Sequence, residues 1–239
     1  MARPSTLLPV VLCCLIASCP ATSQAIPSPF SANVTLTTDY LYRGLSQTDS
    51  DPAIQGGFDY THSSGFFAGL WASNVDFATT RPRNEPRDLE IDYYIGYNRE
   101  IGADWSAQAT LIRYTYPGAD PDFHYDYNEL LVDATLRGLV TVGLGYTNDI
   151  FGTDAAAITY ELTGRYPIAE HFDVHAGVGL FDLDDLLDES HLYWNLGVSV
   201  FVGQFTFDLG YFDTDSTAER LFGEAAGDRV VLSLSAAIR

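Results

Sequence analysis

The stretch Leu89-Glu-Ile-Asp-Tyr-Tyr-Ile-Gly-Tyr-Asn98 alternates two kinds of residue along its whole length. Its odd-numbered positions are apolar or aromatic, and most of its even-numbered positions are polar. Side chains of a β-strand point alternately to the two faces of the sheet. The stretch therefore predicts a strand with one apolar face and one polar face.

The same alternation recurs about twelve times between Ala32 and Arg239, and the connections between these stretches alternate between long and short. Long polar connections such as Asp213–Gly227 follow every first strand of a pair, whereas turns such as the one at Gly138 follow every second. A soluble sandwich has no reason to sort its loops in this way. The pattern predicts an all-β fold, a closed antiparallel transmembrane β-barrel of about 12 strands with short periplasmic turns and long extracellular loops.

Two of the expected strands have distinctive features. The first is expected over Ala32–Arg43, with Asp39 and Arg43 on its polar face. The third is expected over Phe66–Phe77, and it is apolar on both faces at first, so its alternation is weak. Near its end Asn74 and Asp76 suggest the polar face.

Residues 1–25 have the features of a secretory signal peptide. The apolar run Leu7–Ala17 is too short to span a membrane, and small residues precede a cleavage point after Ala25. Ile16-Ala-Ser-Cys19 also resembles a lipobox, so lipidation at Cys19 is the alternative. Residues 26–239 show no linker or change of composition, and we expect one outer-membrane barrel domain there.

The composition excludes several classes of partner. The formal net charge of −20 would repel nucleic acid. The cysteines at positions 13, 14 and 19 all lie in the leader, so the mature chain can form no disulfide and no thiolate metal site. The acidic stretch 182–189 lacks the glycine and the spacing of an EF-hand loop. We therefore expect no metal and no cofactor.

The residues also argue against an enzyme. The five histidines are scattered, and no Gly-x-Ser-x-Gly elbow is present. Glu90 and Asp92 could act as an acid and a base, but a pair on one face of a strand is far more often part of a polar lumen. No catalytic residue is predicted.

If the apolar faces contact lipid, the polar faces line the lumen. The predicted pore-lining residues are Asp39, Arg43, Asp59, Asp76, Glu90, Asp92, Glu129, Asp133, Glu161, Arg165, Asp173 and Asp208. Because a lone carboxylate in a dry lumen is costly, we expect some of Asp39, Asp59, Glu90 and Asp92 to pair with Arg43 or Arg165 and to form a constriction.

Several motifs resemble the TorF-type porin family, also known as the Gcw_chp family of uncharacterised proteobacterial outer-membrane proteins. They include Asn33-Val-Thr-Leu-Thr-Thr-Asp-Tyr-Leu-Tyr-Arg-Gly-Leu-Ser-Gln-Thr48, Ala68-Gly-Leu-Trp-Ala-Ser-Asn-Val-Asp-Phe77 and Glu90-Ile-Asp-Tyr-Tyr-Ile-Gly-Tyr97. The resemblance implies an outer-membrane barrel with a porin role and no settled substrate. The chain departs from the usual pattern of such barrels because it ends in Arg239 rather than in an aromatic residue.

The expected function is passive diffusion of small solutes across the bacterial outer membrane, with a preference for cations or neutral molecules. Its expected partners are small solutes together with outer-membrane lipid and lipopolysaccharide. Two alternatives stay open at this point. Salt bridges could plug the lumen, and the chain could be a non-conducting barrel whose acidic loops bind a surface partner or organise lipopolysaccharide.

Overall fold

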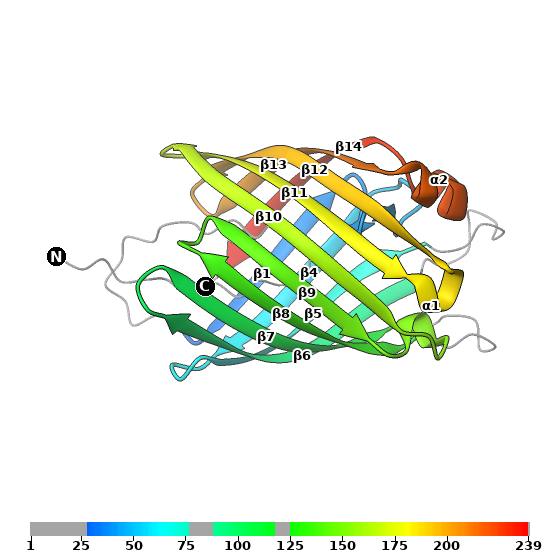
Figure 1. Ribbon diagram of the computed structural model, residues 1–239. Helices are drawn as coiled ribbons and strands as arrows, with labels where there is room; N and C mark the ends of the chain where they lie inside the picture. The colour runs from blue at the N-terminus through cyan, green and yellow to red at the C-terminus, as the bar shows by residue number, and fades with distance from the viewer. Residues whose placement is uncertain (1–27, 77–87, 118–124, 239) are drawn as a thin grey trace.

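In the computed structural model, which describes residues 28–76, 88–117 and 125–238, the chain forms a closed barrel (Figure 1). Every neighbouring pair of wall strands is antiparallel, and the last strand closes on the first. The wall consists of β1 (Phe30–Thr37), β4 (Ala53–Thr61), β5 (Phe66–Val75), β6 (Asp88–Ile101), β7 (Trp105–Thr115), β8 (Tyr127–Leu136), β9 (Val140–Thr147), β10 (Ala157–Ala169), β11 (Phe172–Leu183), β12 (Glu189–Val202), β13 (Phe205–Thr214) and β14 (Arg229–Ile238). The predicted closed antiparallel barrel of twelve strands is confirmed.

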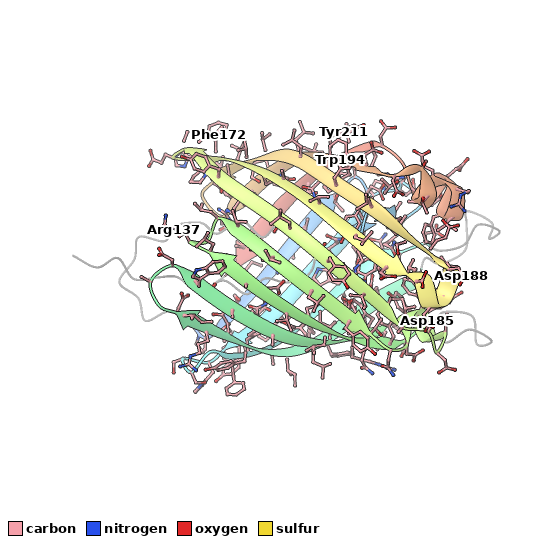
Figure 2. The ribbon with its side chains drawn as sticks, viewed as in Figure 1. Arg137, Phe172, Asp185, Asp188, Trp194 and Tyr211 are labelled. Carbon is pink, nitrogen blue, oxygen red and sulfur yellow. The ribbon has the colours of Figure 1, made fainter. Side chains whose placement is uncertain are left out.

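The remaining elements of the described chain all lie in connections at one end of the barrel. They are β2 (Leu41–Tyr42), β3 (Leu45–Ser46), the 3₁₀ turns η1 (Ile150–Gly152) and η2 (Gly223–Ala225), α1 (Asp184–Leu187) and α2 (Ser216–Phe222). Figure 2 shows Asp185 and Asp188 at this long-loop end, and Arg137 and Phe172 at the opposite, short-turn end. No helix in the described ranges has the length and apolar character needed to cross a membrane.

The outer surface is an apolar belt, as the alternation predicts. Outward side chains such as Ile95, Val142 and Leu196 are more than half exposed. Aromatic residues contribute too, and Figure 2 shows Trp194 and Tyr211 on the outside of the wall, where their rings lie 5.4 Å apart. An apolar surface that encircles the molecule is unstable in water, so the belt is the surface that faces lipid.

The lumen differs between its two halves. Near the long-loop end, aromatic side chains fill it, among them Trp71, Tyr114 and Phe181, which are at most 6% exposed. Toward the short-turn end the inward positions carry polar residues, of which Thr141 is half-buried and Thr163 exposed, whereas His175 and Ser199 are buried. The lumen is therefore packed with aromatic side chains near the long-loop end, and it is polar with some solvent-accessible positions toward the short-turn end.

Two strand predictions were wrong. β1 ends at Thr37 rather than at Arg43, because the chain turns into the lumen after Thr38. In β5 the inward face carries Trp71, Ser73 and Val75, all buried, whereas the predicted Asp76 follows the end of the strand. The large ring of Trp71 packs inside the barrel, so its apolar character misled the assignment of the two faces.

A charged side chain on the lipid-facing belt should destabilise the barrel. Leu144 lies near the middle of β9 on the lipid side and is 44% exposed. We expect Leu144→Arg to lower the free energy of unfolding in lipid by about 2–4 kcal/mol. Thr163→Arg, on the solvent-accessible inner face of β10, is the matched control and should cost much less. Urea unfolding in liposomes measures both, and equal losses would contradict the assignment of the two faces.

A lumen hairpin and its buried charges

Residues 38–52, which we call the lumen hairpin, leave the wall between β1 and β4 and fold into the barrel. Thr37 and Ala53 are paired neighbours, so the two ends of the hairpin lie side by side. Inside it, β2 pairs with β3 around a tight turn at Arg43 and Gly44, whose φ angles are 52° and 82°. Positive φ favours glycine, and a side chain at Gly44 would also collide with the wall, 2.6 Å from Thr214 Cγ2.

Arg43, at the tip of this hairpin, forms a buried ion pair with Glu129 of β8. The two side chains are 4% and 1% exposed, respectively. The Arg43 guanidinium also lies 4.5 Å from the ring centroids of Tyr42 and Phe181, which adds cation–π attraction. Gly145 makes room for the pair, since a Cβ there would lie 2.8 Å from Glu129 Oε1.

Tyrosine hydroxyls complete the surroundings of Glu129. Tyr114 donates a hydrogen bond of 3.0 Å to Glu129 Oε2, and Tyr42 and Tyr127 lie hydroxyl to hydroxyl at 3.1 Å. The rings of Tyr114 and Tyr127 stack at 4.4 Å. A buried carboxylate is tolerated when it has a cation and hydrogen-bond donors, and both are present here.

Further contacts hold the rest of the hairpin against the wall. Asp39 accepts hydrogen bonds from Ser46 (2.7 Å) and Thr48 (3.0 Å) within the hairpin and from Arg229 Nη1 of β14 (2.9 Å). His191 Nε2 of β12 lies 3.1 Å from the carbonyl oxygen of Arg43. The hairpin therefore reaches across the lumen and contacts wall strands on several sides.

The hairpin closes the lumen at its own level. The inward residues there, including Tyr42, Glu129, Phe181 and His191, are at most 4% exposed. Side chains that line a water-filled pore would keep exposed surface. In this conformation the hairpin and these side chains fill much of the lumen at that level among the described residues.

A second group of acids lies beside the hairpin. Glu90 accepts a hydrogen bond of 3.0 Å from Tyr116, and Asp59 accepts one from Tyr94. Burial raises the pKa of the Tyr116 hydroxyl, and the nearby Glu90 carboxylate raises it further. Asp92 is 2% exposed, and its Oδ1 has no hydrogen-bond partner.

The acids toward the short-turn end are paired locally. Arg165 of β10 forms an ion pair with Asp173 of the adjacent β11. Asp208 Oδ2 accepts a hydrogen bond from Ser199 at 2.6 Å and lies 3.0 Å from His175 Nε2. These side chains pair with neighbours along the inner wall and do not bridge the lumen.

The predicted set separates into distinct groups. On the wall strands Asp59, Glu90, Asp92, Glu129 and Asp173 are buried, and Asp133, Glu161, Arg165 and Asp208 are half-buried. Asp39 and Arg43 are buried too, but they lie in the hairpin. That they line a conducting path stays a prediction.

The prediction that Arg43 or Arg165 pairs with one of the acids Asp39, Asp59, Glu90 and Asp92 was wrong. Arg43 pairs with Glu129 and Arg165 pairs with Asp173, whereas Asp39 pairs with Arg229. The reason is the early end of β1, which moves Arg43 from the wall to the tip of the hairpin. The tyrosines that surround Glu129 were not predicted as site residues, and the Arg43-Gly44 turn was the only local signal for the hairpin.

Comparison with solved structures finds barrels of similar shape at very low sequence identity. A KdgM porin matches with a TM-score of 0.55 and 7% identity over 87% of this chain and 99% of that one. The KdgM porin in complex with disordered oligogalacturonate gives 0.54 and 6%, covering 88% and 99% of the two chains. A NanC porin gives 0.53 and 9%, again covering 88% and 99%. These likenesses show a shared fold.

A search of curated proteins finds no match. A family model described as a bacterial protein of unknown function, Gcw_chp, matches residues 21–237, which is nearly the whole chain. The extent of this match agrees with the motifs between Asn33 and Tyr97 that suggested the family. The chain therefore belongs to the Gcw_chp family of bacterial proteins.

Proposed function

We propose that this protein is an outer-membrane channel for passive diffusion of small solutes, favouring cations or neutral molecules. The observation that carries the proposal is the combination of a complete apolar belt with a charged, acid-rich interior. Two of the solved barrels of similar fold, KdgM and NanC, are named porins, which supports a channel role. In this arrangement the short turns lie in the periplasm and the long loops lie outside the cell.

Charge gives the expected preference. Inward acids on the described wall strands outnumber inward arginines, and two of these acids, Asp133 and Glu161, are only half-buried. Rings of carboxylates favour cations in a channel. Oligogalacturonate is a ligand of the KdgM porin in its complex, whereas the acidic lumen here argues against acidic solutes.

One observation favours a different function. The lumen hairpin leaves the inward residues at its level almost without exposed surface, which fits a non-conducting barrel. Its acidic loops would then act outside the cell, where Asp184 and Asp185 begin α1. They would bind a surface partner or help to organise lipopolysaccharide. In either case we infer no enzymatic activity and no cofactor.

Ion selectivity separates these functions. In planar bilayers with a salt gradient, we expect a reversal potential of the sign that indicates cation permeation. Asp133→Asn combined with Glu161→Gln should reduce it, because both changes remove negative charge from half-buried positions on the inner wall. Asp185→Asn, in an external loop, is the control and should leave it nearly unchanged.

An anion-selective current would refute the proposed charge preference. No current under any condition, from protein shown to be folded by heat-modifiable migration on a denaturing gel, would favour the non-conducting barrel.

The predicted signal peptide and the cleavage after Ala25 fall outside the described residues, as does the alternative lipidation at Cys19. They stay predictions, and the mass of the mature protein would decide between them.

A further inference from the structure

Glu90 and Asp92 are two buried carboxylates on the same inward face of β6. Each residue is 2% exposed. One oxygen of each, Glu90 Oε2 and Asp92 Oδ1, has no hydrogen-bond partner. Residues two apart on a strand share a face and lie close together. Both unpartnered oxygens therefore belong to one small region of the lumen.

Among the residues that the structure describes, none brings a positive charge to this region. The arginines inside this end of the described barrel are paired elsewhere, the buried Arg43 with Glu129 and the half-buried Arg229 with Asp39. None of the ion pairs formed within the described ranges includes Glu90 or Asp92. An ionised carboxylate that is buried without a partner is strongly unfavourable. The region therefore favours either a proton on one of the carboxyls or a bound cation.

The surroundings indicate which kind of cation. Trp71 of β5 is the cross-strand neighbour of Asp92, and the ring of Tyr40 from the lumen hairpin meets the Trp71 ring at 5.3 Å. Aromatic rings near a carboxylate suit a cation that also carries apolar groups. Calcium needs six to eight oxygen ligands, and the described residues contain no cluster of three or more acidic, histidine or cysteine side chains able to hold a metal ion.

We propose that Glu90 and Asp92 form a binding site for the ammonium group of a protonated organic amine. Its N–H groups would donate hydrogen bonds to Glu90 Oε2 and Asp92 Oδ1, and Trp71 would contact its apolar part. Tyr40, which hydrogen-bonds Glu90 and packs against Trp71, lies beside the site and would move with the lumen hairpin when an amine enters. The inference rests on the proposed channel function and narrows it to amine-bearing solutes.

Trp71 provides a direct test. The chain has three tryptophans, and the other two, Trp105 and Trp194, face outward and are 45% and 40% exposed. Trp105→Phe with Trp194→Phe leaves Trp71 as the only tryptophan emitter. The purified barrel in detergent is titrated with methylammonium chloride against sodium chloride at constant ionic strength and neutral pH. We expect a saturable change in the emission of Trp71.

Variants test the two carboxylates. Asp92→Asn should weaken methylammonium binding by at least about tenfold, or 1.4 kcal/mol, and Glu90→Gln provides the same test if that variant fails to fold. Glu170→Gln, at an exposed turn, is the matched control and should leave binding unchanged.

Several outcomes would overturn the site. They are the absence of a saturable change, an unchanged midpoint in Asp92→Asn, and calcium saturating the signal at a lower concentration than methylammonium. A Trp71 signal that follows pH but not methylammonium would show that a shared proton supplies the missing charge instead. The fluorescence titration measures binding and does not depend on conduction. A barrel that binds methylammonium but carries no current would therefore contradict only the channel function. A conducting barrel without a saturable signal contradicts only the site.

Discussion

Replacing Asp39–Ser50 with a short Gly–Ser linker is expected to give a steady current several-fold larger than that of the intact chain. The linker needs to span little distance, because Thr37 and Ala53 are paired neighbours in the wall. The replacement removes the part of the chain that closes the lumen at the level of Glu129. Without the hairpin, water can reach Glu129. Its carboxylate is then hydrated, so the loss of Arg43 does not leave a buried charge without a partner.

Single-channel recording in planar bilayers measures this effect. As a control, the loop Thr153–Ala156, which connects η1 to β10 outside the hairpin, is also replaced by a Gly–Ser linker. If the intact and hairpin-less barrels carry the same steady current, the hairpin does not limit passage. If neither conducts, the channel function itself is contradicted.

Arg43→Ala is expected to cost about 3–5 kcal/mol of unfolding free energy, because Glu129 would stay buried without its cation. The double variant Arg43→Ala with Glu129→Gln should recover most of this loss, since the neutral amide has no charge to compensate. Arg137→Ala is the matched control. Its ion pair with Asp104 lies at an exposed turn, with side chains 67% and 49% exposed, and solvent screening should leave it little effect on stability.

Urea unfolding in detergent measures these free energies. A cost for Arg43→Ala no larger than that for Arg137→Ala would show that the pair is hydrated in solution and that the hairpin is not held by it. In bilayers the same Arg43→Ala variant should raise conductance and strengthen cation selectivity, since a looser hairpin opens the lumen and the remaining charge of Glu129 is negative. A shift toward anions would contradict this electrostatic role of Arg43.

The alternation of residues was enough to predict most of the wall. In β6 the residues from Leu89 to Asn98 alternate cleanly, and in the structure their apolar members face outward and their carboxylates face inward. The reason is geometric. The period of a strand is two, and a wall with lipid on one side and polar groups on the other repeats that period in the sequence.

The alternation failed where an aromatic ring faces inward. Tyr40 and Tyr42 continue the apolar pattern of β1, yet they leave the wall and pack inside the barrel, at 4% exposure each. Trp71 does the same from β5. An apolar ring leaves water equally well by contacting lipid or by filling a lumen, and the local pattern is identical in both cases.

The sequence by itself therefore determined the twelve-strand barrel, the family and the acidic character of the interior. Only the tertiary structure decided that residues 38–52 fold inward, that Arg43 meets Glu129, and that Glu90 and Asp92 have no counter-charge among the described residues. Such pairings depend on contacts between segments far apart in the chain, 86 residues apart for Arg43 and Glu129. A pattern of period two carries no information about which inward side chains meet across the lumen, because it describes each strand alone.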